Sequence, residues 1–286
     1  MNNPFVTVFI PSYNHEKYVK KAIQSVLDQT YDNIELIVID DGSTDNSVEI
    51  IKKLAKKNEF KFIVQENTGL TPTLNKGVQL AKGEFFCELS SDDHLQKTYI
   101  KKQVTFMQEQ DDIAMVAASL IIIDATGEIQ ENKHKSLTPK KYDFDDIMFK
   151  GCNVPAPGML FRTAILADIG GFNPNIQLED WQIQLKLTSQ GHLITINPDA
   201  KVYYRLHGEN NVLRASWMAD QMLATINEYS EHKDFPRIRK IWYLRLFKKL
   251  AKVDKKKAKE FLPQVLKYFY MPAFWHGVRR LLLNRY

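Results

Sequence analysis

The stretch VTVFIPSYN, residues 6–14, begins the pattern that decides the fold of this chain. Its apolar run, Val6 to Ile10, has the length of a buried strand and ends at Pro11, and the segment from Glu16 to Gln29 follows with the apolar spacing of a helix. The alternation recurs, with apolar runs at residues 34–39, 60–64 and 85–89 and helical segments at 46–54 and 72–81. It predicts an α/β fold with a doubly wound, mostly parallel sheet, which binds ligands at the carboxyl ends of its strands.

The rest of the chain divides into a mixed middle and a helical end. A hairpin is expected around residues 124–127, a strand at 158–161, a helix at 179–189 and a strand at 193–205. From residue 212 the spacing is purely helical, with interruptions expected at Pro236, Pro263 and Pro272. We therefore predict a domain of residues 1–211, with halves at about 1–95 and 96–211, and a helical C-terminal extension of residues 212–286.

The composition is that of a globular protein with an uneven distribution of charge. The 286 residues are 44% hydrophobic and 26% charged, which excludes wholesale disorder, collagen and a coiled coil. The net charge of +5 has two unlike parts, because residues 236–286 contain 15 Lys and Arg against two acidic residues, and the remainder contains 24 against 32. An acidic body and a basic end indicate an anionic partner surface for the end of the chain.

Neither targeting nor cysteine chemistry is indicated by the sequence. Cys87 and Cys152 lack the spacing of a disulfide framework or a zinc site. The N-terminus enters a strand without the basic and apolar regions of a signal peptide, and we find no apolar run long enough to span a membrane. We expect a cytoplasmic protein.

Polar clusters follow the predicted strands. Pro11-Ser-Tyr-Asn14 can present backbone amides and a ring to a planar base, and Asp41, in the cluster Asp40-Asp-Gly-Ser-Thr-Asp45, can accept a hydrogen bond from a base or ribose. A strand-ending turn and a capped loop are the bland alternatives. The adjacent acids Asp92 and Asp93 come directly after a buried strand, where Mg²⁺ or Mn²⁺ would neutralise them, although solvated helix capping is the competing interpretation.

Two further clusters lie downstream. Asp180, at a predicted helix start beside Trp181, has the setting of a general base, or it serves only the helix dipole. Arg205 and His207 lie on the same side of an extended strand and can face one anion, whereas an isolated histidine is more often structural.

In this order and spacing, the clusters resemble the family 2 glycosyltransferases, which have the GT-A fold. The resemblance covers about residues 5–211 and rests on residues 8–14, 40–45, 67–75, 83–84, 91–93, 170–172, 179–181 and 204–207. It implies a nucleotide site and names its members: Pro11, Tyr13, Asp41, Asn67, Lys76, Ser91 and Asp92.

The resemblance also implies a divalent metal and two catalytic acids. Asp92 matches the metal-binding acid, which would hold Mn²⁺ or Mg²⁺ with His207, and Ser90 stands where the family usually has an aspartate. Asp180 matches the catalytic base and Glu179 would position the acceptor. The diphosphate and acceptor contacts would come from three further residues: Asp93, Arg205 and Trp181.

We therefore expect a metal-dependent, inverting glycosyltransferase. It would transfer a sugar from a nucleoside-diphosphate sugar to a hydroxyl of a glycan or lipid-linked glycan, in the synthesis of a bacterial surface polysaccharide such as O-antigen, capsule or lipooligosaccharide. A sugar-phosphate nucleotidyltransferase would need a Gly-rich, basic phosphate loop after the first strand, where this chain has Pro11-Ser-Tyr-Asn14. A non-catalytic glycan-binding protein of the same fold is the second alternative.

The basic end has its own expected partner. Phe274, Trp275 and residues 281–283 lie among arginines, as in a helix that binds the anionic inner face of the cytoplasmic membrane. The alternatives are a helical subdomain packed on the body, an oligomer contact, or RNA binding, which is disfavoured because no nucleic-acid module is present.

Overall fold

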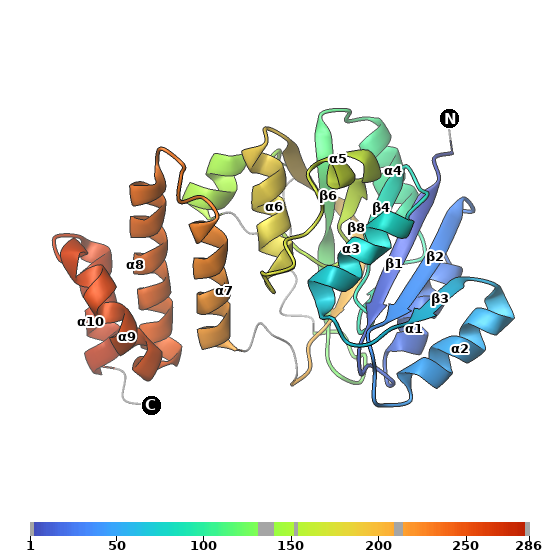
Figure 1. Ribbon diagram of the computed structural model, residues 1–286, viewed down its shortest axis with the longest axis horizontal. Coiled ribbons are helices and arrows are strands. Elements are labelled where there is room, and N and C mark those ends of the chain that lie inside the picture. The colour runs from blue at the N-terminus through green and yellow to red at the C-terminus, as the bar shows by residue number, and fades with distance from the viewer. Residues whose placement is uncertain (1–2, 131–139, 152–153, 209–213, 284–286) are drawn as a thin grey trace. The chain divides into compact units, whose positions relative to one another are not determined.

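The computed structural model describes residues 3–130, 140–151, 154–208 and 214–283. The chain forms two compact units, residues 1–207 and 208–286, and each is described by itself (Figure 1). The boundary expected between residues 211 and 212 lies outside the described residues.

The first unit contains an eight-stranded sheet in the order β3-β2-β1-β4-β7-β6-β8-β5. The first five strands in the chain are β1 (Val6–Ser12), β2 (Ile34–Asp40), β3 (Lys61–Val64), β4 (Phe85–Glu88) and β5 (His94–Leu95). The other three are β6 (Ile113–Ile123), β7 (Leu160–Arg162) and β8 (Leu193–Arg205). Neighbours from β3 to β4, and β6 with β8, are parallel, whereas β7 and β5 run antiparallel to their neighbours. The prediction of an α/β fold with a mostly parallel sheet is confirmed.

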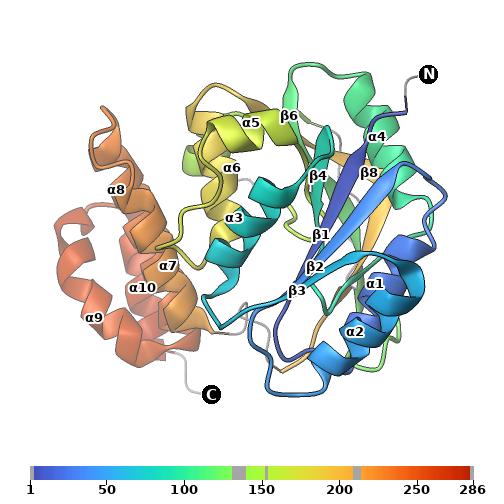
Figure 2. The same ribbon diagram turned by 45° about the vertical axis from the view of Figure 1, so that its right-hand side comes forward.

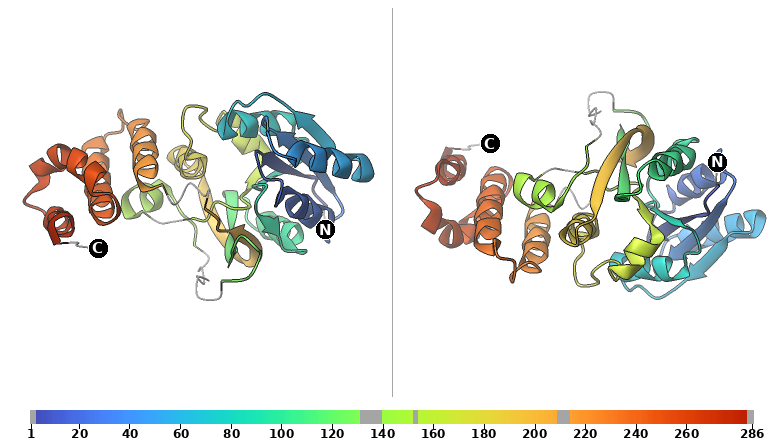
Figure 3. Two further views of the ribbon diagram at one scale, coloured as in Figure 1. Left: turned by 90° about the horizontal axis from the view of Figure 1, so that it is seen from below. Right: turned by 90° about the horizontal axis from the view of Figure 1, so that it is seen from above.

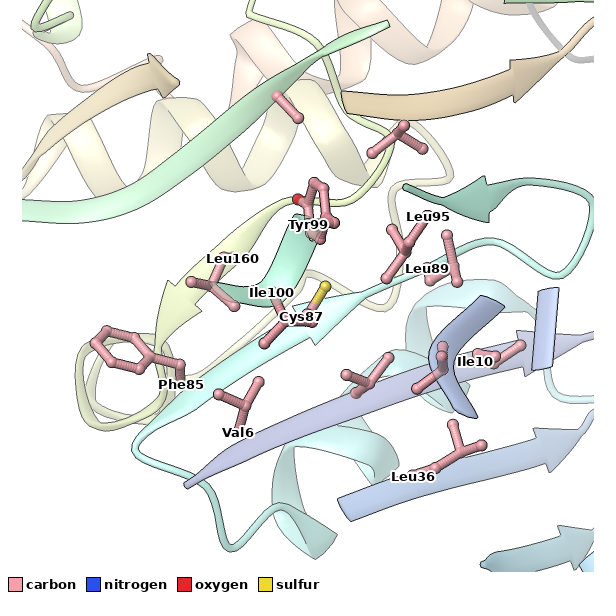
Figure 4. Packing of buried hydrophobic residues seen from close by; sticks show 14 of the residues in the cluster. Val6, Ile10, Leu36, Phe85, Cys87, Leu89, Leu95, Tyr99, Ile100 and Leu160 are labelled. Carbon is pink, nitrogen blue, oxygen red and sulfur yellow. The ribbon is translucent and has the colours of Figure 1, made fainter. Parts of the chain in front are cut away.

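Helices cover both faces of this sheet (Figures 2 and 3). They are α1 (Val19–Leu27), α2 (Ser47–Asn58), α3 (Leu70–Leu80), α4 (Tyr99–Gln108), α5 (Thr163–Asp168) and α6 (Glu179–Ser189), with a π-helix at Asp146–Lys150. Helices α1, α2 and α4 share one core with the sheet, in which Val6, Phe85, Cys87 and Tyr99 are fully buried (Figure 4).

The strand register brings the polar loops together. Ser12 of β1 pairs with Asp40 of β2, and Phe9 pairs with Glu88 of β4, so these parallel strands end at the same edge of the sheet. Strand β5 pairs His94 with Tyr203 of β8 and thereby carries the preceding acidic loop to the end of β8. The sequence clusters that follow β1, β2, β4 and β8 therefore meet at one edge.

Two expectations about proline are wrong. Strand β1 continues through Pro11 to Ser12. The Ser12 carbonyl accepts the Asp41 N–H, so the backbone of Ser12 faces β2 and that of Pro11 faces the opposite side. The missing N–H of Pro11 therefore costs no hydrogen bond to β2. Pro263 does not interrupt a helix either, because α9 (Lys255–Val265) includes it and ends two residues later, after the loss of one bond.

The second unit is built from helices, as predicted for the C-terminal extension. Helices α7 (Ala215–Asn227), α8 (Phe235–Val253), α9 and α10 (Pro272–Leu283), with a 3₁₀ turn at Leu266–Tyr268, enclose a core that includes Phe247, Leu250 and Phe261. Phe274 belongs to this core, where it is 3% exposed and stacked on Phe247. The expectation that Phe274 contacts a membrane is therefore wrong. None of the helices in the described residues is both long enough and apolar enough to cross a bilayer.

Candidate active site

Asp41 lies on the loop that follows β2 and is 4% exposed. Its Oδ1 accepts hydrogen bonds from Gln65 Nε2 at 2.8 Å and from the Thr68 N–H at 2.9 Å, and its Oδ2 accepts one from the Gly69 N–H at 2.8 Å. The carboxylate therefore fastens the loop before α3 to the end of β2. A nucleotide base that used Asp41 would have to share it with these donors, a structural role that the sequence did not indicate.

The loop after β1 is fixed to the loop after β2. Asn14 has a φ of +54°, and its side-chain oxygen accepts a hydrogen bond from the Thr44 N–H at 2.8 Å. The next residue, His15, donates its backbone N–H to Ser47 Oγ at 3.0 Å and accepts at its carbonyl from the N–H groups at the start of α1. Both the backbone donor and the backbone acceptor of His15 are thus satisfied, which sets the direction of its side chain.

The acidic loop after β4 is clasped by the end of β8. Asp93, 2% exposed, accepts the backbone N–H of Arg205 at 2.8 Å. The Arg205 guanidinium donates to the backbone carbonyls of Asp92 at 2.9 Å and Asp124 at 3.0 Å, and lies over the Tyr18 ring at 4.7 Å. Arg205 therefore holds the acidic loop in shape, in addition to any contact with an anion.

A carboxylate and two imidazoles converge beside this clasp. His207 Nε2 lies 3.0 Å from Asp92 Oδ2, and His15 Nδ1 lies 2.7 Å from Ser91 Oγ. One ligand atom from each of His15, Asp92 and His207 lies within 4.8 Å of the others. One oxygen and two nitrogen donors suit a divalent transition ion such as Mn²⁺, so the residues present fit the expected metal.

Charge and burial act on the two adjacent acids in opposite ways. Burial alone would raise the pKa of Asp92, but the hydrogen bond from His207 and the nearby His15 hold that pKa below its ordinary value. Burial, and then the charge of Asp92, raise the pKa of Asp93 well above its ordinary value. Asp92 is thus the ionised member of the pair.

Glu179 and Asp180 begin α6, as predicted. Burial raises the pKa of both, and the charge of Asp180 adds to the effect on Glu179. The Trp181 N–H donates to Asp180 Oδ1 at 2.6 Å and favours its ionised form. A partly buried carboxylate at a helix start, with a pKa moved towards neutrality, has the properties of a general base.

Glu88, which the sequence pattern did not single out, lies within electrostatic range of both acidic groups. Burial, and then the charges of Asp180 and Asp92, raise its pKa to about 8. Tyr204 is also affected by acids from both places. Burial, and then the charges of Asp93, Asp92 and Asp180, raise its pKa to about 12. The acid-bearing start of α6 and the acidic loop after β4 therefore lie within electrostatic range of the same two side chains. Glu88 is the one acidic residue within the apolar run predicted at residues 85–89, and that position was the signal that could have found it.

The remaining predicted residues are placed as follows. Pro11 is buried in β1 and Tyr13 is 47% exposed beside it. Asn67 is exposed, whereas Lys76 donates to Gln65 Oε1 at 2.7 Å.

Similarity to known proteins is found in both the sequence and the fold of this chain. A model of the family described as "Glycosyl transferase family 2" matches residues 7–170. EpsH of Bacillus subtilis is 38% identical over 116 residues, which are 40% of this chain and 34% of EpsH, so the match spans about a third of that relative.

The solved structures that share the fold include two with bound sugar nucleotides. The S. aureus TarS fragment 1–349, in complex with UDP-GlcNAc, has a TM-score of 0.66 at 19% identity and covers 97% of this chain and 81% of that chain. The mannosyltransferase PcManGT from Pyrobaculum calidifontis, in complex with GDP-Man and Mn²⁺, has a TM-score of 0.65 at 16% identity and covers 100% of this chain and 82% of that chain.

Proposed function

This chain belongs to glycosyl transferase family 2, and we propose on that ground that it transfers a sugar from a nucleoside-diphosphate sugar to a hydroxyl of a glycan or lipid-linked glycan, with inversion at the anomeric carbon. The observation that carries the proposal is that Asp180 of α6 and Asp92 after β4 both lie within electrostatic range of Glu88, so the fold brings the two acids to the same region. One of these acids can serve the nucleophile and the other the leaving group.

The donor side of the site is assigned to the loops after β1, β2 and β4. Tyr13, exposed at the end of β1, would stack on the base, with Pro11 and Asp41 beside it. Asn67 and Lys76 would supply further contacts from the loop before α3 and from α3 itself. These roles are supported by the position of all five residues at or near the carboxyl edge of the sheet, where α/β folds bind nucleotides.

Asp92 and His207 would hold a divalent cation, Mn²⁺ or Mg²⁺. When bound, such a cation neutralises negative charge that develops on a diphosphate leaving group. Asp92 is suited to the role because it is 7% exposed and yet keeps a low pKa. Arg205 fixes the backbone on which Asp92 stands, and Asp93 is held by the same clasp.

Asp180 would act as the base. As the acceptor oxygen forms its bond to the anomeric carbon, the bond from that carbon to the diphosphate oxygen breaks, and the acceptor proton passes to the Asp180 carboxylate. A single in-line displacement inverts the anomeric configuration. Glu179 and Trp181 flank Asp180 on the first turn of α6 and would orient the acceptor.

We also propose that the second unit binds the anionic inner surface of the cytoplasmic membrane, which fits a lipid-linked acceptor and surface-polysaccharide synthesis. Residues 236–286 carry a net charge of +13. Trp275 and Leu282, which are 58% and 72% exposed, lie seven residues apart on α10 with the exposed Arg279 between them. This set of three residues, the outer face of α10, combines apolar and basic side chains as interfacial helices do.

The test is to incubate the full chain with a panel of nucleoside-diphosphate sugars and Mn²⁺ and to identify the products. Release of the nucleoside diphosphate with transfer, or slow hydrolysis, of the sugar supports the proposal. Formation of a sugar 1-phosphate and nucleoside triphosphate on addition of pyrophosphate would identify a nucleotidyltransferase. Thermal stabilisation by a donor without turnover on any acceptor would point to a binding protein.

A further inference from the structure

We propose that His15 is a third protein ligand of the divalent cation, and that it makes the site prefer transition ions such as Mn²⁺ to Mg²⁺. The proposal rests on the proposed role of Asp92 and His207 as ligands. It concerns a residue that lies on a different loop from either of them, directly after the quoted segment 6–14.

The position of His15 is fixed by contacts that are independent of any metal. Its backbone N–H donates to Ser47 Oγ at 3.0 Å, and the Tyr18 and Val19 N–H groups donate to its carbonyl at 2.9 Å. Its ring packs edge-on against Tyr18, with centroids 6.1 Å apart, and against His207 at 5.9 Å. The imidazole therefore does not need to be ordered when a cation binds, which favours binding.

The hydrogen bond to Ser91 gives His15 the arrangement of a metal ligand. Its Nδ1 lies 2.7 Å from the hydroxyl of Ser91, which is 1% exposed and precedes Asp92. Histidine ligands of metals commonly donate their other ring N–H to a neighbouring oxygen, and this fixes the tautomer and the ring direction. A proton held on Nδ1 places the lone pair of the ring on Nε2. Ser91 would thus act on the metal through His15.

The donor set then determines which ion is preferred. His15, Asp92 and His207 supply two imidazole nitrogens and one carboxylate oxygen, with their ligand atoms within 4.8 Å of one another. Mg²⁺ takes oxygen ligands and seldom imidazole, whereas imidazole affinity rises from Mn²⁺ towards Zn²⁺ along the first transition row. A site of Asp92 and His207 alone would discriminate less between Mn²⁺ and Mg²⁺. With three protein ligands, the site should also bind its cation before a nucleotide arrives.

The experiment is metal titration of the full chain without nucleotide, by calorimetry and by the loss of the free Mn²⁺ EPR signal. We expect the wild type to bind Mn²⁺ more tightly than Mg²⁺. His15→Ala should lower the affinity for Mn²⁺ by about tenfold or more, the scale on which altered metal-site contacts act. The affinity for Mg²⁺ should change by less than about threefold, and His15→Asp should shift the preference towards Mg²⁺. His192→Ala, at the opposite end of β8 from Arg205, is the matched control.

An unchanged Mn²⁺ affinity or unchanged Mn²⁺ to Mg²⁺ ratio in His15→Ala would overturn the proposal. If this variant fails to fold, pulsed EPR of Mn²⁺ on the wild type decides, because two coordinated imidazoles support the proposal and a single one refutes it. If Mn²⁺ binding depends on His15 but no sugar is transferred, the proposed function is contradicted and the role of His15 as a ligand stands. Sugar transfer with His15-independent binding would remove only the inference.

Discussion

Asp180 is the residue whose chemistry can be separated most sharply from binding. Its pKa is raised by burial, so its carboxylate is a stronger base than an exposed one, and it lies on the first turn of α6. We predict that Asp180→Asn lowers turnover by about 10²–10⁴-fold, the usual range for a lost general base, while the donor dissociation constant changes by less than about threefold. Steady-state kinetics and calorimetry with donor and Mn²⁺ would measure both. An equal loss of donor binding would contradict the assignment.

Glu88 should make the stability of the first unit fall as pH rises. In the folded protein burial and the neighbouring acids raise its pKa to about 8, from an ordinary value of 4.5, so the folded form keeps a proton that the unfolded form has lost. Stability is therefore lost progressively from about pH 4.5 to pH 8. We predict that Glu88→Gln raises the melting temperature at pH 8 by about 2–4 °C for each kcal/mol recovered, with little change at pH 5.

The control for this prediction is Glu84→Gln, which changes an exposed residue at the other end of the same strand. It should shift the melting temperature equally little at both pH values. A Glu88→Gln protein whose melting temperature differs from wild type by the same amount at pH 5 and pH 8 would show that Glu88 does not titrate between them.

Residue types and their order predict which side chains gather at the sheet edge, but not what each one contacts. Asp92 and His207 were predicted from the sequence to hold one metal ion together, and His207 Nε2 lies 3.0 Å from Asp92 Oδ2. The hydrogen bonds of Asp41 depend on how the loop before α3 folds back, and nothing in the local spacing reveals that. His15 and Glu88 were missed because the sequence does not show their distant neighbours, Ser91 for His15 and Asp180 for Glu88, which lie more than 70 residues away in the chain.

At the scale of elements, α3 shows packing prevailing over helix propensity. Gly77 lies inside α3, where alanine would ordinarily be better by about 1 kcal/mol. A Cβ there would lie 2.7 Å from ring carbons of Phe9, which is fully buried and stacked on Phe86. We therefore predict that Gly77→Ala destabilises the protein by about 1–3 kcal/mol, as overpacking does. Denaturant unfolding would measure it.

Two comparisons isolate the cause of this effect. Gln79→Ala, at an exposed position of the same helix, should be neutral or slightly stabilising. Phe9→Leu would open room for the new methyl group, so Gly77→Ala should cost less in that background than in the wild type. Additive effects in the double-mutant cycle would argue against a contact between α3 and β1 as the cause.

Strong periodic patterns predicted elements well, and irregular ones did not. Helix Glu179–Ser189 and strand Leu193–Arg205 have the bounds read from the sequence. The π-helix Asp146–Lys150 was not predicted, because its buried apolar residues, 147–149, are consecutive and show no helical period. The buried Asp146 also pairs with Lys140 and Lys150, which the spacing did not indicate. Pro11 and Pro263 were overestimated as breaks. Pro11 leaves the pairing of β1 with β2 intact, and Pro263 removes one hydrogen bond from a helix that ends two residues later.

At the scale of the whole molecule, the two units differ in what their charges do. In the first unit, acidic side chains lie together at one edge of the sheet. Asp92 is there the proposed ligand of a cation, and Asp180 is the proposed acceptor of a proton. In the second, the core of Phe247, Phe261 and Phe274 accounts for part of the apolar content of the basic end. That core does not bury all of the apolar side chains. Four of them remain more than half exposed: Phe269, Tyr270, Trp275 and Leu282.

The outer face of α10 should therefore govern binding to anionic vesicles. We predict that the full chain sediments with phosphatidylglycerol vesicles but only weakly with neutral ones, and that binding falls as salt screens the +13 charge of residues 236–286. Trp275→Ser with Leu282→Ser should lower partitioning by about tenfold or more, because each apolar side chain contributes roughly 1–3 kcal/mol when buried. Val64→Ser, which removes a 52% exposed apolar side chain from the first unit, should leave it unchanged. Equal binding by the double variant and wild type would show that the apolar residues of α10 do not enter the bilayer.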